Sequence, residues 1–160
     1  MQVPVRQRWF EDYPVGERFE VGDYPITERE IVEFATRYDP QPFHVDPVAA
    51  QAGPFGGLIA SGWMTAGILM RLLVDHFISP LSSLGSPGID ELRWTKPVRP
   101  GDRLHVRVRV LQLRRSVSKP DRGLMQLQQE VVDQHGDTVM TVRGWGLYRS
   151  RSAVAPGPGS

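Results

Sequence analysis

The chain of 160 residues contains no cysteine and almost no excess of charge, with 19 Lys and Arg against 18 Asp and Glu. The absence of cysteine excludes disulfides, thiol nucleophiles and cysteine-ligated metal sites. A net charge of +1 gives no reason to expect a nucleic-acid or membrane partner. Composition alone therefore leaves an ordinary globular protein whose chemistry must come from oxygen and nitrogen groups.

Long apolar runs are also missing. The most apolar segment, residues 62–77, is interrupted by Arg71 and Asp75, so it falls short of the roughly 20 clean residues that a membrane span needs. The first residues lack the apolar core of a signal peptide. We therefore expect a cytoplasmic protein with one domain over residues 1–150. Residues 151–160 are mostly small residues, proline and glycine, and we expect a disordered tail there.

The residues around Thr27 predict the N-terminus of a helix. Thr27 and Glu30 match the S/T-x-x-E pattern of a capping box, and apolar residues then recur at helical spacing up to Tyr38. Pro40 disfavours helical backbone at Asp39, so the helix is expected to end there.

Two more helices are predicted downstream. Asp46 and Pro47 suit the N-cap and first position of a short helix through residues 48–52. A longer helix is expected from about Gly62 to about Phe77, with Ser61 as its N-cap. Apolar residues occupy most of its circumference, which is typical of a buried helix.

The rest of the chain has the pattern of strands. Residues 104–110 alternate apolar side chains with His105, Arg107 and Arg109, as in an antiparallel sheet with one wet face. Stretches rich in β-branched and aromatic residues cover 88–98, 102–116, 123–134 and 137–150, and a further strand is expected within 16–27. The order predicts an α+β protein. A single antiparallel sheet wrapped around a long central helix is the hot-dog fold.

Residues 38–47, YDPQPFHVDP, place Asp39 and His44 five positions apart in a segment broken by three prolines. In one interpretation Asp39 caps a turn and His44 fills a polar notch. In the other, the two side chains converge on one cavity and work as an acid–base pair. Asp46 is interpreted as a helix cap and Ser61 as a cap instead of a nucleophile, since no G-x-S-x-G elbow surrounds it.

Residues 34–67 resemble the MaoC-like, R-specific enoyl-CoA hydratase family. That family's motif is D-x-N-P-x-H-x-D, followed after a short helix by F-x-x-x-I-x-H-G. The matching positions are Asp39, Gln41, Pro42, His44, Asp46, Phe55, Ile59, Ser61 and Gly62. Residues 91–104, ELRWTKPVRPGDRL, are similar to the strand–turn–strand that follows the central helix in that family.

The resemblance implies a hydratase or dehydratase without metal or separate cofactor, acting on an acyl-CoA substrate. Asp39 and His44 would hold one water that adds to a trans-2-enoyl thioester, giving a (3R)-hydroxyacyl-CoA. The backbone N–H of Gly62, at a helix N-terminus, would stabilise the enolate oxygen. Candidate substrate-binding residues are Gln41, Phe43, Phe55, Ser61, Trp63 and Met64.

Two departures from the motif bear on substrate range: Gln41 stands for the usual Asn, and Ser61 for the usual His. The competing interpretations are a thioesterase on the same fold and a non-catalytic acyl-CoA-binding protein. The resemblance also leads us to expect a homodimer or a dimer of dimers, because one such sheet leaves an unpaired edge.

The remaining histidines and cationic side chains are interpreted as structural or solvent-facing. His76, His105 and His135 lack metal-site spacing. The row of Arg107 and Arg109 is expected to face solvent, and the alternative is that this row, or Arg93 with Lys96, meets the phosphates of coenzyme A.

Overall fold

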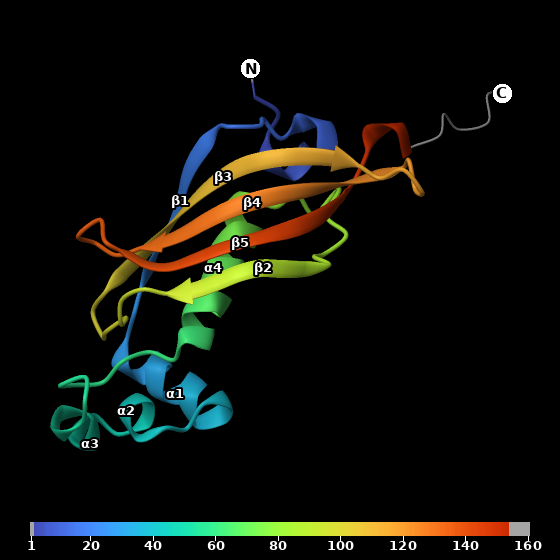
Figure 1. The fold of residues 1–160 in the computed structure, drawn as a ribbon. Coiled ribbons are helices and arrows are strands. Elements are labelled where there is room, and N and C mark those ends of the chain that lie inside the picture. Colours follow the sequence, from blue (N-terminus) through green and yellow to red (C-terminus); the bar gives the residue numbers. More distant parts are fainter. Residues whose placement is uncertain (1, 154–160) are drawn as a thin grey trace.

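The computed structural model describes residues 2–153 and confirms the α+β prediction (Figure 1). Its five-stranded antiparallel sheet has the order β1-β3-β4-β5-β2 and wraps around the long helix α4. This is the predicted hot-dog arrangement. The strands are β1 (Arg18–Pro25), β2 (Gly88–Trp94), β3 (Arg103–Arg115), β4 (Arg122–Val132) and β5 (Thr138–Arg149). The α-helices are α1 (Glu28–Tyr38), α2 (Pro42–Val45), α3 (Pro47–Ala52) and α4 (Gly62–His76).

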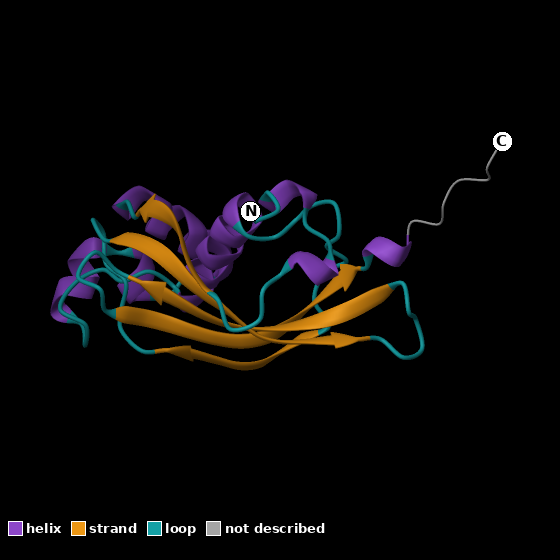
Figure 2. Ribbon diagram, turned by 90° about the horizontal axis from the view of Figure 1, so that it is seen from above, coloured by secondary structure: helices purple, strands orange, loops and turns teal. Residues whose placement is uncertain are grey.

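The core lies between α4 and one face of the sheet. Helix α4 contributes buried Ile68, Leu72 and Leu73, and β3 contributes Val106 and Val108 from the opposite side. Seen from above, the helices gather on the concave side of the twisted strands (Figure 2). The alternation predicted for residues 104–110 of β3 is confirmed, since the four apolar side chains in this range are buried and the residues between them are not.

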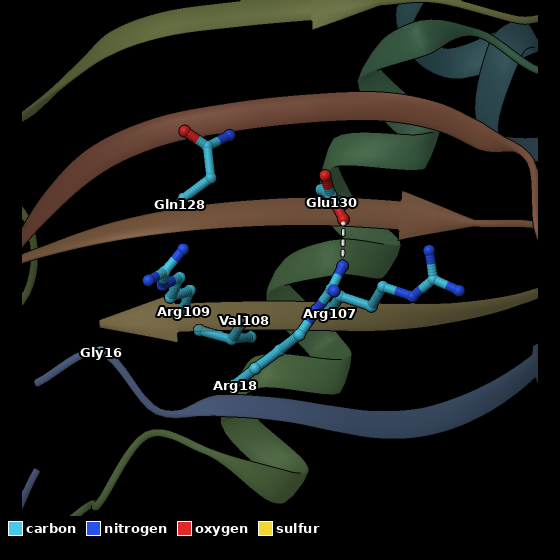
Figure 3. A pocket seen from close by; sticks show the side chains of 7 residues that line it. All are labelled: Gly16, Arg18, Arg107, Val108, Arg109, Gln128 and Glu130. Atoms are coloured by element: carbon cyan, nitrogen blue, oxygen red, sulfur yellow. Dashed lines mark hydrogen bonds and ion pairs between the residues drawn. The ribbon is translucent and has the colours of Figure 1, made fainter. Parts of the chain in front are cut away.

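Figure 3 shows the outer face of the sheet, where a small hollow is lined by charged side chains from β1, β3 and β4. Arg18 pairs with Glu130 at 3.2 Å, and Arg107 pairs with Glu20 at 2.8 Å. Arg109 is exposed on the same face. The arginine row therefore lies on the side of the sheet away from α4, as expected for a solvent face.

The N-caps of α1 and α3, which lie between β1 and α4, are the ones that the sequence predicted. The Thr27 hydroxyl accepts from the N–H of Glu30 at 3.2 Å and caps α1 as expected. The Glu30 carboxylate accepts from the Tyr24 hydroxyl of β1, so in the described structure the second half of the predicted capping box, a bond from the N-cap N–H to Glu30, is not formed. Asp46 caps α3 by accepting from the N–H groups of Val48 and Ala49.

Helix α2 was not predicted, and neither were the short 3-10 helices η1 (Val5–Gln7) and η2 (Phe10–Asp12). Residues 42–45 lie in the segment broken by three prolines, and they form the single-turn helix α2 with Pro42 at its first position. Proline suits that position because its missing N–H would have no intrahelical partner there. The helix carries His44 inward, where that residue is only 5% exposed.

At the C-terminal end, Arg151–Ala153 form a short 3-10 turn, η3. Arg151 pairs there with Asp12 at 2.6 Å, so the described structure continues three residues into the segment expected to be a disordered tail. Residues 154–160 of that expected tail lie outside the described residues. Over residues 2–153, no helix has the length and apolar character needed to cross a bilayer.

Candidate active site

Asp39 and His44 are brought together at the junction of α1 and α2. Asp39 is the C-cap of α1, and its N–H donates to the Ala35 carbonyl at 2.8 Å. From α2, the Nε2 atom of His44 lies 3.2 Å from Oδ2 of Asp39. The two side chains thus converge on one place, as the interpretation of an acid–base pair requires.

The other ring nitrogen of His44 is held by the chain that leads into α4. Nδ1 lies 2.7 Å from the carbonyl oxygen of Ile59. A carbonyl oxygen can only accept, so Nδ1 carries a hydrogen. The tautomer is thereby set, and Nε2 is the nitrogen that faces Asp39 and can exchange a proton with it.

Two further side chains hold the Asp39 carboxylate. Gln41 donates to Oδ1 at 2.7 Å, and the Ser61 hydroxyl donates to Oδ2 at 2.7 Å. The hydrogen bond from Gln41 is the main cause that holds the pKa of Asp39 below its usual range; burial opposes it, and Ser61 and His44 add to it. Asp39 is therefore a carboxylate near neutral pH, the form that can accept a proton.

Ser61 and Gln41 therefore share a partner, Asp39, that the sequence did not indicate. Ser61 does cap α4, accepting from the N–H of Trp63 at 3.3 Å, but its hydroxyl is also a ligand of Asp39. Gln41 was a candidate substrate contact, and its amide donates to Asp39. The fold, by turning α4 back toward α1, produces a contact that spans 22 positions in sequence.

Gly62 opens α4 directly beside the pair, and Trp94 of β2 covers it. The Trp94 indole N–H donates to the Gly62 carbonyl at 2.9 Å. A Cβ built on Gly62 would lie 2.4 Å from the indole ring. Glycine is needed at position 62 because the Trp94 indole packs directly on the Gly62 Cα. The sequence had suggested a different reason for this glycine, the close approach of a substrate. Trp94 was not among the predicted site residues, and its position in the strand–turn–strand match was the available signal.

A cavity of about 460 Å³ opens beside Asp39 and His44. Of the predicted substrate-binding residues, Phe43, Phe55 and Trp63 line it, and so does Gly62. Met64 is different: it is 3% exposed and belongs to the hydrophobic core, outside the lining of this cavity. The aromatic walls and the few polar groups are typical of a small-molecule site.

The aromatic side chains around the cavity are packed against one another. Phe43 meets Phe55 edge-on with ring centroids 5.2 Å apart, and it contacts the His44 ring at 4.6 Å. Trp63 and Trp94 form a second edge-on pair at 5.2 Å. These contacts fix the aromatic rings against one another in the lining that also contains Asp39 and His44.

The cationic side chains near the cavity are already partnered. Lys96 lines it, but its ammonium group binds Asp133 at 2.7 Å and Asp137 at 2.9 Å. Arg93 pairs with Glu91 at 2.9 Å. Over the part of the chain that the structure describes, no cluster of three or more His, Asp or Glu side chains is placed to hold a metal ion.

Comparison with known proteins gives consistent results. Residues 12–132, more than half of the chain, match the family model described as a MaoC like domain. A 3-hydroxybutyryl-CoA dehydratase from Methylorubrum extorquens is 34% identical over 115 residues, which cover 71% of this chain and 70% of that protein. Among the first three curated relatives, the match spans 72%, 30% and 61% of the relative's own length.

Solved structures agree over nearly the whole fold. The crystal structure of a MaoC-like dehydratase from Rhodospirillum rubrum is 42% identical, with a TM-score of 0.83, covering 90% of this chain and 98% of that one. The R-hydratase PhaJ1 from Pseudomonas aeruginosa is 25% identical, with a TM-score of 0.71, covering 95% and 94%. The chain therefore belongs to the MaoC-like family of hot-dog hydratases and dehydratases.

Proposed function

We propose that this protein adds water to a trans-2-enoyl-CoA thioester, giving a (3R)-hydroxyacyl-CoA, and catalyses the reverse dehydration. The observation that carries the proposal is the contact between His44 Nε2 and Asp39 Oδ2 at 3.2 Å, beside a cavity of about 460 Å³. The names of the 3-hydroxybutyryl-CoA dehydratase and the R-hydratase among its relatives support the reaction and its stereochemistry.

The geometry suits proton transfer in both directions. Asp39 is ionised and takes a proton as the water oxygen bonds to C3 of the enoyl group. The double-bond electrons move toward the thioester, and its oxygen becomes an enolate. The Asp39–His44 pair then returns one proton to C2, so that one water has been added and no charge remains. These side chains supply the proton chemistry without a separate cofactor, coenzyme A being part of the substrate.

The enolate oxygen needs a donor close to the pair. Gly62 lines the cavity at the first position of α4, and within residues 2–153 no backbone carbonyl accepts from its N–H. First-turn N–H groups of a helix have no intrahelical acceptor, and the helix dipole favours negative charge there. We assign the enolate oxygen to this N–H.

Crotonyl-CoA tests the proposal directly. Hydration removes the conjugated thioester, so we expect its ultraviolet absorbance to fall without release of free thiol, and we expect the product to be (3R)-hydroxybutyryl-CoA by chiral chromatography. Longer and branched enoyl-CoA esters in the same assay define the acyl range. Free thiol in step with substrate loss would instead establish a thioesterase, and binding without either change would establish a non-catalytic acyl-CoA-binding protein.

We also propose that two copies of the chain associate through β2 and α4. Strand β2 is an edge strand, bonded to β5 alone within the described sheet. Beside it, Trp63, Met70 and Val74 lie along one stripe of α4 and are 61%, 51% and 53% exposed. An unpaired edge next to an exposed apolar stripe favours isologous pairing, which covers both at once.

We therefore expect sedimentation at micromolar concentration to give at least twice the 18.0 kDa of one chain. Met70→Glu puts a charge in the middle of the stripe and should shift the protein toward monomer. Val117→Glu is the matched control, because Val117 is 98% exposed in the β3–β4 turn. A monomeric wild-type protein, or equal behaviour of the two variants, would contradict this interface.

A further inference from the structure

Ser61 connects the start of α4 to the Asp39 carboxylate. Its hydroxyl donates to Oδ2 of Asp39 at 2.7 Å and accepts from the N–H of Trp63 at 3.3 Å. A hydroxyl has one hydrogen, so the donor is directed to the carboxylate and a lone pair to the helix. The residue is fully buried, and water does not compete for either bond.

The two oxygens of Asp39 differ in how many of their hydrogen-bond acceptor positions remain open. A carboxylate offers about four lone-pair positions, two on each oxygen. Oδ2 receives the Ser61 hydroxyl, and its other side faces His44 Nε2 at 3.2 Å, so both of its positions are turned toward neighbouring side chains. Among the described residues, Gln41 is the one donor to Oδ1, which leaves one position of this oxygen open. Asp39 itself lines the cavity.

We infer that Ser61 is a positioning residue: it keeps Oδ2 of Asp39 turned toward His44 and thereby reserves Oδ1 as the oxygen that takes the proton from water. The inference rests on the proposed function and specifies which atom performs it. Because Ser61 accepts from a first-turn N–H of α4, its O–H is also polarised toward the carboxylate. Without this bond the carboxylate could rotate and offer its oxygens to water interchangeably.

The ionisable groups around Asp39 are few. His44, from α2, is in contact with it. Lys96 lines the same cavity but is held by two aspartates. Arg37, in the last turn of α1, stacks over the neighbouring Tyr38 ring at 5.2 Å, and the first turn of α4 carries no acidic residue. A change in the titration of Asp39 can therefore be traced to its hydrogen-bond donors and to His44.

Two substitutions separate positioning from helix capping. Glycine is nearly as good an N-cap residue as serine, whereas alanine is a poor one. A capping role predicts that Ser61→Gly keeps the activity and Ser61→Ala loses part of it. The positioning role predicts that both lower kcat for crotonyl-CoA by about tenfold or more, with a smaller change in KM, since a hydrogen bond to a charged group is lost in each. Ser61→Thr keeps the hydroxyl and should restore most of the rate.

Thr27→Ala is the matched control. Thr27 caps α1 through the same kind of bond, 3.2 Å to the N–H of Glu30, and is not a ligand of Asp39. It should lower the free energy of unfolding, as the loss of an N-cap does, while kcat and its pH dependence stay at the wild-type values.

The pH profile provides the decisive readout. Removing a donor to the charged form raises the pKa of Asp39, and the base works only when ionised, so the acid limb of kcat should move to higher pH in Ser61→Ala and Ser61→Gly. Carboxyl carbon NMR should show the same upward shift for Asp39 without substrate. An unmoved acid limb, or wild-type kcat in both variants, overturns the inference while the proposed function stands. Failure of the wild-type enzyme to hydrate any enoyl-CoA overturns the proposed function itself.

Discussion

Asp39→Asn is expected to lower turnover of crotonyl-CoA by roughly a hundredfold or more, because the shape is kept and the proton acceptor is lost. His44→Ala should cost a similar factor, since it removes the group that lies 3.2 Å from Oδ2. If the two act as one unit on one water, the double variant should be little worse than either single variant. Loss of conjugated-thioester absorbance measures all four proteins.

A matched control for Asp39→Asn lies seven residues away. Asp46 is also a helix-terminal aspartate, but it caps α3 through Val48 and Ala49. Because asparagine caps helices about as well as aspartate, Asp46→Asn should keep the wild-type rate. Near-wild-type hydration by folded Asp39 and His44 variants would show that the pair is a structural feature of the loop.

Gly62→Ala should be the most damaging single-methyl addition near the site. The new Cβ would lie 2.4 Å from the Trp94 ring, so the indole must move and its bond to the Gly62 carbonyl must break. Overpacking of this kind costs about 1–3 kcal/mol of unfolding free energy. Displacing the first turn of α4 by even 1 Å should also lower kcat by about a hundredfold, and thermal unfolding with steady-state kinetics measures both effects.

Gly67→Ala gives the comparison for Gly62→Ala, because both residues lie in α4 and a Cβ at Gly67 would meet nothing within 4 Å. It should leave kcat unchanged and raise stability slightly, since alanine favours helix over glycine. Trp94→Leu in the Gly62→Ala background should recover part of the lost stability by making room for the methyl group. The variants are compared at the same oligomeric state, checked by sedimentation. Equal effects of the two alanines would contradict the role assigned to the Trp94 contact.

Local patterns in the sequence were sufficient for most of the fold. The Thr27 cap and the run of apolar residues from Gly62 led to the observed starts of α1 and α4. The alternation in β3 indicated its buried face. These features depend on periodicity and on capping groups within a few residues, which act over short stretches of chain. Helix α2 was missed because a single turn is too short to show a period.

The Asp39–His44 pair could also be found in the sequence, since both residues lie in one short segment and resemble a known motif. The roles of Ser61, Gln41 and Trp94 could not. Ser61 reaches Asp39 across 22 positions, and Trp94 reaches Gly62 across 32. Such contacts form only when α4 packs against the sheet and the C-terminal end of α1 lies beside the N-terminus of α4. The sequence by itself thus determined most of the elements and singled out the Asp39–His44 pair, whereas the packing of distant segments decided how Asp39 is held and why residue 62 is glycine.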